Sequence, residues 1–171
     1  MYYQLVSQCI DNFKQMAVWL DKAEQHAVAR KFDVNILMDG RLAPDMRPFT
    51  YQVQSASDYV KAAAGWLTGQ RPPKYEDNEK TIDELRERIR KTVAFAESVT
   101  EVAYADAADR YLTLPWKQGK VMRAADYLQQ ITIPNVFFHA AMGYAILRHN
   151  GVDLGKMDFL GQLNFIDPPR A

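Results

Sequence analysis

Apolar residues recur at steps of three and four along most of this chain, which is the spacing of amphipathic helices. One such stretch runs from about Tyr3 to Arg30, and a second from about Phe49 to Leu67. Pro48 stands just before the second stretch, where its missing N–H costs nothing in the first turn of a helix. These patterns predict two long helices in the first part of the chain.

Two further helices are predicted in the second half, each with a terminal signal. Thr81-Ile82-Asp83-Glu84 has the form of a capping box, in which the Thr hydroxyl and the Glu carboxylate each satisfy an unpaired backbone N–H. The last helix is expected from about Ala124 to Asn150-Gly151, a strong helix stop. Pro134 interrupts its pattern, which predicts either one kinked helix or a short helix followed by a long one.

The segment before the last helix has a different character. Tyr111 to Pro115 and Lys120 to Met122 flank Trp116-Lys117-Gln118-Gly119, and the alternation with a glycine predicts a short β-hairpin or extended loop. Beyond Val152, the tail is expected to dock through apolar side chains, namely Leu154, Phe159, Leu160 and Phe165. The whole pattern predicts an all-α protein, a four-helix bundle formed by residues 1–171 as a single domain.

Composition narrows the classes of function. Lys plus Arg and Asp plus Glu number 21 each, so the chain lacks the basic excess that nucleic acids or anionic membranes attract. No stretch approaches the roughly 18 apolar residues of a membrane span, and no signal peptide is recognised, so a cytoplasmic location is expected. The single cysteine, Cys9, is interpreted as a small buried residue; the alternative is a nucleophile, although no histidine lies near it in sequence.

The candidate chemistry centres on His139. The sequence has no phosphate-binding glycine loop, no Cys-x-x-Cys and no His-Glu-x-x-His. Asn135 and His139 stand four residues apart and therefore share one helical face. Metal sites on helices are commonly formed by pairs of polar ligand residues one turn apart. The alternative is a buried histidine that hydrogen-bonds to its neighbours.

Helix two supplies the other candidates. Gln52 shares its face with an apolar position and is expected to point inward, while Gln54 and Asp58 lie one turn apart. Asp58 is also a candidate member of an ion-pair knot with Arg41 and Asp45. Several aromatic residues are candidates for an apolar pocket, or else for plain core, namely Tyr59, Trp66, Phe137, Phe138 and Tyr144.

Several short segments occur together in a fixed order: Leu20 to Glu24, Arg41 to Met46, Thr113 to Pro115, Pro134 to His139, Ala145 to Gly151 and Gly155 to Gly161. Together they resemble a bacterial family of unknown function within the DinB/YfiT-like superfamily of metalloenzymes. The resemblance spans nearly the whole chain. It implies a DinB-like four-helix bundle and a homodimer.

The resemblance also implies where a site would lie. Members of the wider superfamily bind a divalent metal through one histidine of helix two and a His-x-x-x-His pair of helix four, and they include thiol-dependent transferases. Here helix two has no histidine. If His139 belongs to the pair, its partner position holds either Asn135 or Gly143. An Asn–His–Gln set is a poor zinc site, so the expected metal site is incomplete.

Two functions follow from these observations. The first is a small-molecule enzyme, a transferase or hydrolase, with His139 as metal ligand or general base and Asp58 as its helper. In that hypothesis the ligand would be bound by Gln52, Gln54, Asn135 and Tyr144. The alternative is a non-catalytic ligand-binding or dimerisation module that has lost the metal.

Overall fold

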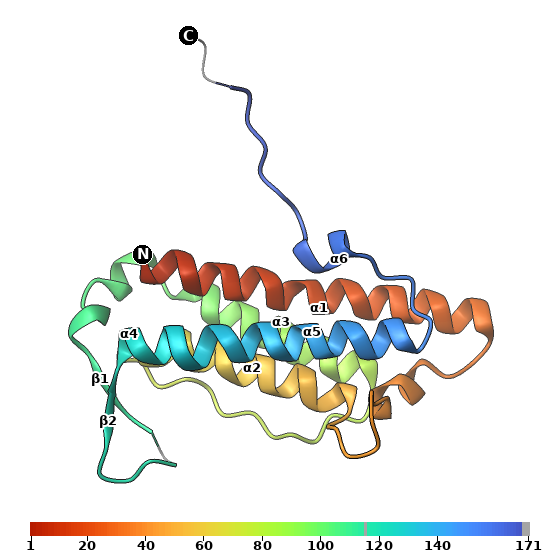
Figure 1. The fold of residues 1–171 in the computed structure, drawn as a ribbon, viewed down its shortest axis with the longest axis horizontal. Coiled ribbons are helices and arrows are strands. Elements are labelled where there is room, and N and C mark those ends of the chain that lie inside the picture. Colours follow the sequence, from red (N-terminus) through yellow and green to blue (C-terminus); the bar gives the residue numbers. More distant parts are fainter. Residues whose placement is uncertain (115, 169–171) are drawn as a thin grey trace.

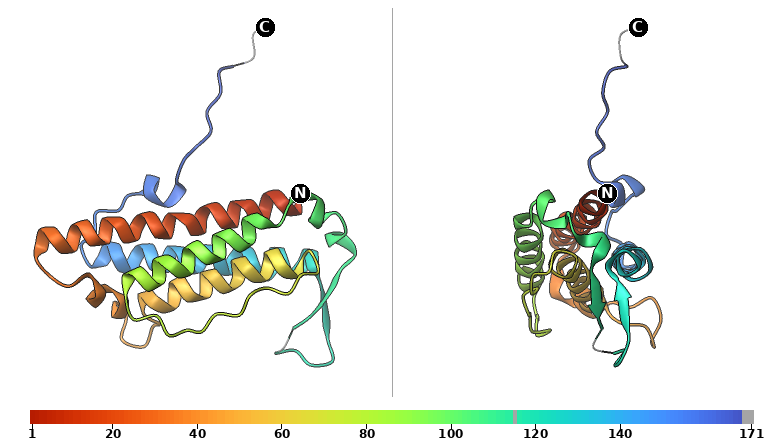
Figure 2. Two further views of the ribbon diagram at one scale, coloured as in Figure 1. Left: turned by 180° about the vertical axis from the view of Figure 1, so that it is seen from behind. Right: turned by 90° about the vertical axis from the view of Figure 1, so that its left-hand side faces the viewer.

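The computed structural model describes residues 1–114 and 116–168. Its body is the predicted bundle of long helices (Figure 1), formed by α1 (Tyr2–Arg30), α2 (Phe49–Trp66), α3 (Ile82–Ser98) and α5 (Ile133–His149). Helices α1 and α5 run in one direction and α2 and α3 in the other, because the segment 67–81 returns along the length of the bundle before α3 begins (Figures 1 and 2). Each of α1 and α2 packs against both α3 and α5.

Shorter elements connect the long helices. They are η1 (Val34–Asp39), η2 (Glu101–Tyr104), η3 (Ala107–Asp109), β1 (Tyr111–Thr113), β2 (Val121–Arg123), α4 (Ala124–Tyr127), η4 (Leu128–Thr132) and α6 (Lys156–Leu160). Strands β1 and β2 pair antiparallel with Leu112 opposite Met122, which confirms the predicted hairpin. The hairpin projects from one end of the bundle, beside α4 (Figure 1).

Local signals set the helix ends as expected. The Thr81 hydroxyl accepts from the Glu84 N–H at 3.2 Å, and the Glu84 carboxylate accepts from the Thr81 N–H at 3.1 Å, so the capping box is formed. The predicted interruption at Pro134 takes the form of the π-helical segment η4, after which Pro134 occupies the first turn of α5. A proline has no N–H to donate, and it is tolerated there because a first turn requires none.

The interior contains the predicted apolar stripes, with Phe13, Trp19 and Phe49 fully buried between the helices. Cys9 is also fully buried, which confirms its interpretation as a core residue. Burial raises the pKa of its thiol to about 12, so Cys9 stays protonated at neutral pH.

The tail docks only in part. Leu154 is buried, and Phe159 of α6 stacks on Trp19 with ring centroids 5.9 Å apart, while the Trp19 indole N–H donates to the Asp158 carbonyl at 2.9 Å. The docking prediction is wrong for Phe165, which is 87% exposed, and Leu160 remains half exposed. After α6 the chain leaves the body of the protein (Figure 1). No helix within the described residues has the length and apolar character needed to cross a membrane.

Candidate functional site

His139 of α5 points at Gln52 of α2 in the bundle interior. The His139 Nδ1 lies 2.8 Å from the Gln52 Oε1, and only 8% of the His139 surface is exposed. The Gln52 amide nitrogen donates to the Arg47 carbonyl at 3.1 Å, which leaves its oxygen to face the histidine. Nδ1 must therefore carry the proton, and in the neutral ring Nε2 keeps its lone pair.

Aromatic rings enclose this histidine. Tyr59 lies nearly parallel to the imidazole at 6.0 Å, whereas Tyr51 and Phe138 approach edge-on at 5.9 and 5.3 Å. Burial among these groups lowers the pKa of His139 to about 4. The ring is therefore neutral at physiological pH, with Nε2 available as a weak base or hydrogen-bond acceptor.

The pKa of His139 makes stability depend on pH. An unfolded histidine binds a proton near pH 6.5, whereas the folded ring resists protonation until about pH 4. The unfolded state therefore binds more protons in this window, and stability is lost as the pH falls through it, by up to about 3 kcal/mol. Urea denaturation of the wild type and His139→Leu at pH 7.5 and 5.0 measures this. We expect the free energy of unfolding to depend less on pH in the variant than in the wild type. The same pH dependence in both proteins would contradict the lowered pKa of His139.

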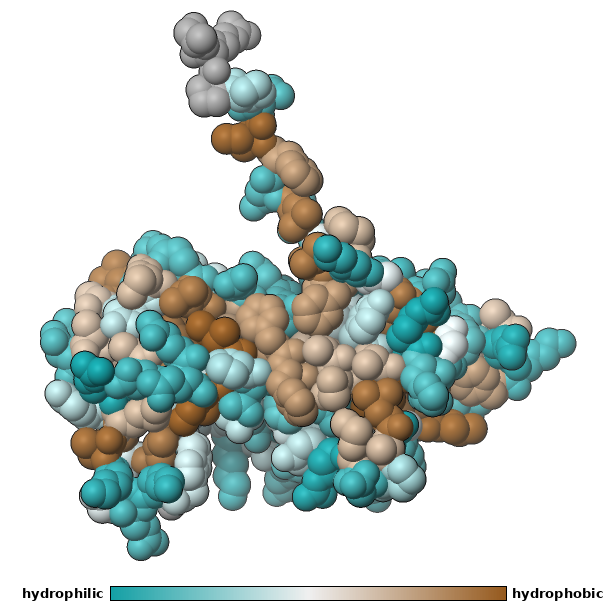
Figure 3. All heavy atoms as spheres, viewed as in Figure 1, coloured by the Kyte–Doolittle hydropathy of each residue, from teal (hydrophilic) through white to brown (hydrophobic). Residues whose placement is uncertain are grey.

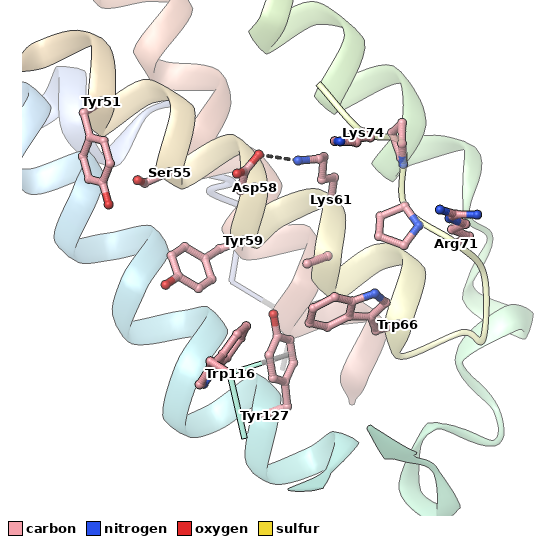
Figure 4. A pocket seen from close by; sticks show the side chains of 13 residues that line it. Tyr51, Ser55, Asp58, Tyr59, Lys61, Trp66, Arg71, Lys74, Trp116 and Tyr127 are labelled. Carbon is pink, nitrogen blue, oxygen red and sulfur yellow. Dashed lines mark hydrogen bonds and ion pairs between the residues drawn. The ribbon is translucent and has the colours of Figure 1, made fainter. Parts of the chain in front are cut away.

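A cavity of about 740 Å³ lies along one side of α2 (Figure 4). Tyr51 and Tyr59 connect the cavity to His139. Their rings lie beside the imidazole, and the same two residues line the cavity. The other lining residues are Ser55, Asp58, Lys61, Ala62, Trp66, Arg71, Pro72, Pro73, Lys74, Trp116 and Tyr127. His139 thus stands behind an aromatic wall of the cavity.

Asp58 lines this cavity, but a buried arginine holds its carboxylate. The Arg88 side chain is 1% exposed and pairs with Asp58 at 2.9 Å, Asp77 at 2.9 Å and Glu79 at 2.8 Å. Burial alone would raise the pKa of Glu79, but hydrogen bonds from Arg88 and Gln54 outweigh it and lower that pKa. The cluster ties α2, the segment before α3 and α3 itself together.

The predicted ion-pair knot of Arg41, Asp45 and Asp58 is wrong. Arg41 donates instead to the Met46 carbonyl at 2.6 Å, which stabilises its own loop. Asp58 pairs with Lys61 and with Arg88, a partner from α3. An i,i+3 neighbour and a helix packed alongside are closer to Asp58 than the loop is.

Three of the predicted ligand-binding residues form hydrogen bonds with groups other than His139. The Gln54 amide donates to Glu79 at 2.8 Å, and the Asn135 amide donates to the carbonyl of Ile131 in the preceding segment η4 at 2.7 Å. The Tyr144 hydroxyl donates to the Leu154 carbonyl at 3.3 Å, beside α1 and α6. Of the predicted set, the structure brings Gln52 to His139 and Asp58 to the neighbouring cavity.

Sequence reasoning missed much of the cavity wall. Trp116 reaches it from the hairpin, Tyr127 from α4 and Arg71 from the segment after α2 (Figure 4). One part of the wall could have been found from the sequence. Tyr51, Ser55 and Tyr59 recur at steps of four and so share one face of α2. That the hairpin lies over this face is a tertiary feature that no local pattern carries.

The family described as "Domain of unknown function (DUF1993)" matches residues 1–160. The chain belongs to the DUF1993 family. Its fold is similar to that of a DinB family member protein from Shewanella denitrificans, with a TM-score of 0.92 and 38% sequence identity, over 97% of this chain and 95% of that one. No curated protein matches the chain. These similarities agree with the DinB-like bundle expected from the sequence.

The residues around His139 in this DUF1993 protein do not fit a metal centre of the superfamily's kind. Among the described residues, no three His, Cys, Asp or Glu side chains gather where they could hold an ion. A Cβ at Gly143, one turn after His139, would lie 3.0 Å from Met16 Cε and 3.5 Å from Phe49 Cε2. A side chain at position 143 therefore begins in contact with neighbouring side chains, and a second histidine there would require Met16 and Phe49 to move.

Proposed function

We propose that this protein binds a small molecule in the cavity beside α2, with His139 as a neutral polar group behind the cavity wall. A volume of about 740 Å³ is in the range of small-molecule sites. The single observation that carries the proposal is that Tyr51 and Tyr59 join this cavity to the buried His139. A concave aromatic surface beside a titratable group with a strongly shifted pKa is the usual form of a ligand site.

A second candidate function is a metal-independent transferase or hydrolase. The observation that favours it is the fixed tautomer, because Gln52 holds the proton on Nδ1 and so orients Nε2 as the proton acceptor. Esters of p-nitrophenol provide a general test. Hydrolysis that falls to background in His139→Gln, while probe binding in the cavity is unchanged, would support catalysis; equal hydrolysis by both proteins would count against it.

Binding in the cavity can be tested with N-phenyl-1-naphthylamine, a neutral aromatic dye that fluoresces in apolar sites. We expect the wild type to bind it and Ser55→Trp to lose binding, because an indole at this lining position fills the space between Tyr51 and Tyr59. Ser98→Trp, at an exposed position of α3, is the matched control and should bind as the wild type does. Equal binding by both variants would refute the proposed site.

We also propose that the protein forms a homodimer through the outer face of α5. Four outward positions of this helix are apolar, namely Pro134, Phe138, Ala141 and Ala145, and Phe138 is 54% exposed; the exposed Arg148 and His149 follow in the last turn. Figure 3 shows apolar side chains gathered across the face on which α1 and α5 lie. A patch of exposed apolar side chains marks an interaction surface, and a second copy would cover this one with the same surface.

Sedimentation of the purified protein at tens of micromolar tests the dimer. We expect a dimer for the wild type and a monomer for Phe138→Glu, since two carboxylates would be buried at the interface. Val102→Glu adds the same charge at an 82% exposed site on η2 and should leave the dimer intact. A monomeric wild type would contradict the proposal.

A further inference from the structure

We infer that the ligand of the cavity is an anion with a flat apolar body, such as an aromatic carboxylate, sulfonate or phosphate. This inference rests on the proposed function and specifies its ligand. It follows from three features of the cavity: an excess of basic side chains, an aromatic surface, and a rim that is fixed against α2.

The cavity has more positive than negative charge. Lys61, Arg71 and Lys74 line it, and Asp58 is its only acidic lining residue among the described part of the chain. The Asp58 carboxylate is already shared, because the same oxygen pairs with Lys61 and with Arg88. Its negative charge is therefore compensated within the protein and is not left to attract a cation.

Two of the basic residues have no such compensation. Arg71 and Lys74 are exposed, and neither forms an ion pair with any carboxylate that the structure describes. They stand on one rim of the cavity, opposite Tyr51 and Tyr59 (Figure 4). An anionic group bound beside either side chain would gain charge-assisted hydrogen bonds from it.

The rest of the surface suits a flat apolar group. Trp66 and Tyr127 lie side by side with ring centroids 5.3 Å apart and planes tilted by 55°, and Trp116 lies near them (Figure 4). Aromatic rings favour offset or edge-on contact with another ring. The spacing between these rings and the basic rim sets the length of the ligand, with the ring near Trp66 and the anion near Arg71.

The basic rim is held in place by close packing. A Cβ at Gly65 of α2 would lie 2.9 Å from the Pro72 ring and 3.0 Å from the Gln70 carbonyl, so the backbone of this segment rests directly on the helix. Pro72 and Pro73 further restrict the chain between the two basic residues. The backbone of this rim therefore loses little conformational entropy when a ligand binds, and the cost of ordering is confined to the Arg71 and Lys74 side chains.

A pair of dyes with nearly the same ring system tests the charge preference. 8-Anilinonaphthalene-1-sulfonate is N-phenyl-1-naphthylamine with an added sulfonate. We expect the wild type to bind the sulfonate about tenfold more tightly than the neutral dye, with a preference that weakens as salt is raised. In Arg71→Gln/Lys74→Gln the preference should disappear, while binding of the neutral dye stays unchanged.

The matched control is Arg148→Gln/Lys156→Gln, which removes two exposed basic side chains outside the cavity and gives the same net charge. It should keep the preference. Equal binding of the two dyes by the wild type, or the same loss in both double variants, would overturn the inference while leaving the proposed site standing. Failure of both dyes to bind the wild type would overturn the proposed function itself.

Discussion

Replacing Arg88 with methionine should lower the free energy of unfolding by about 3–5 kcal/mol, the usual cost of removing one partner from a buried ion-pair cluster. Methionine keeps the apolar stem but removes the guanidinium that pairs with Asp58, Asp77 and Glu79. The loss should be largest at Glu79, because its side chain is only 9% exposed and its charge would be balanced by no cation, with hydrogen bonds only from the Gln54 amide and a backbone N–H. Urea denaturation at pH 7 measures the change.

Arg90 of the same helix provides the control. It is exposed and, within the part of the chain that the structure describes, pairs only with its neighbour Glu87, so Arg90→Met should change stability little. Adding Glu79→Gln to Arg88→Met should recover part of the loss, because it removes the unpaired buried carboxylate. If Arg88→Met were no less stable than Arg90→Met, the cluster would not be a structural tie between α2 and α3.

The long helices were predictable because each carries its own signals along the chain. Apolar spacing located α1 and α2, the Thr81–Glu84 capping box began α3, and Asn150-Gly151 ended α5. Each of these features depends on residues within a few positions of one another, so no knowledge of the tertiary structure is needed.

The partners of polar groups were much less predictable. Gln54 and Tyr144 both stand on helices at positions compatible with a site, yet each hydrogen-bonds away from His139. The orientation of α2 about its axis decides that Gln52, and not Gln54, faces His139, and packing against α5 sets that orientation. Only the inward direction of Gln52 could be derived, because it shares a face with an apolar residue.

In the tail beyond Val152, too, the contacts of individual side chains could not be predicted from the sequence. Phe159 and Phe165 look alike in sequence, but only Phe159 finds a stacking partner, in Trp19. Its position within the helical turn of α6 directs its ring at α1. Phe165 follows the end of α6 at Gly161, where the chain turns away from the bundle (Figure 1).

Placing a histidine at position 143, one of the two candidate partner positions of His139, should not restore a metal site. Gly143→His must place an imidazole where even a Cβ would contact Met16 and Phe49. An alanine asks only the flexible end of Met16 to move, whereas a histidine must also displace Phe49 and bury a polar ring. Overpacking together with an unpaired imidazole should lower the free energy of unfolding by about 3–5 kcal/mol.

Asn135→His is the matched comparison, since position 135 is only half-buried on the other side of His139. It should fold with nearly wild-type stability, because the lost hydrogen bond from Asn135 to the Ile131 carbonyl of η4 contributes only about 1 kcal/mol. Zinc titration monitored by calorimetry, alongside denaturation, measures both variants. Stoichiometric zinc in a stable Gly143→His protein would show that α5 can move away from α1 and α2. Close packing at Gly143 would then not explain why this chain lacks the superfamily's pair of histidines.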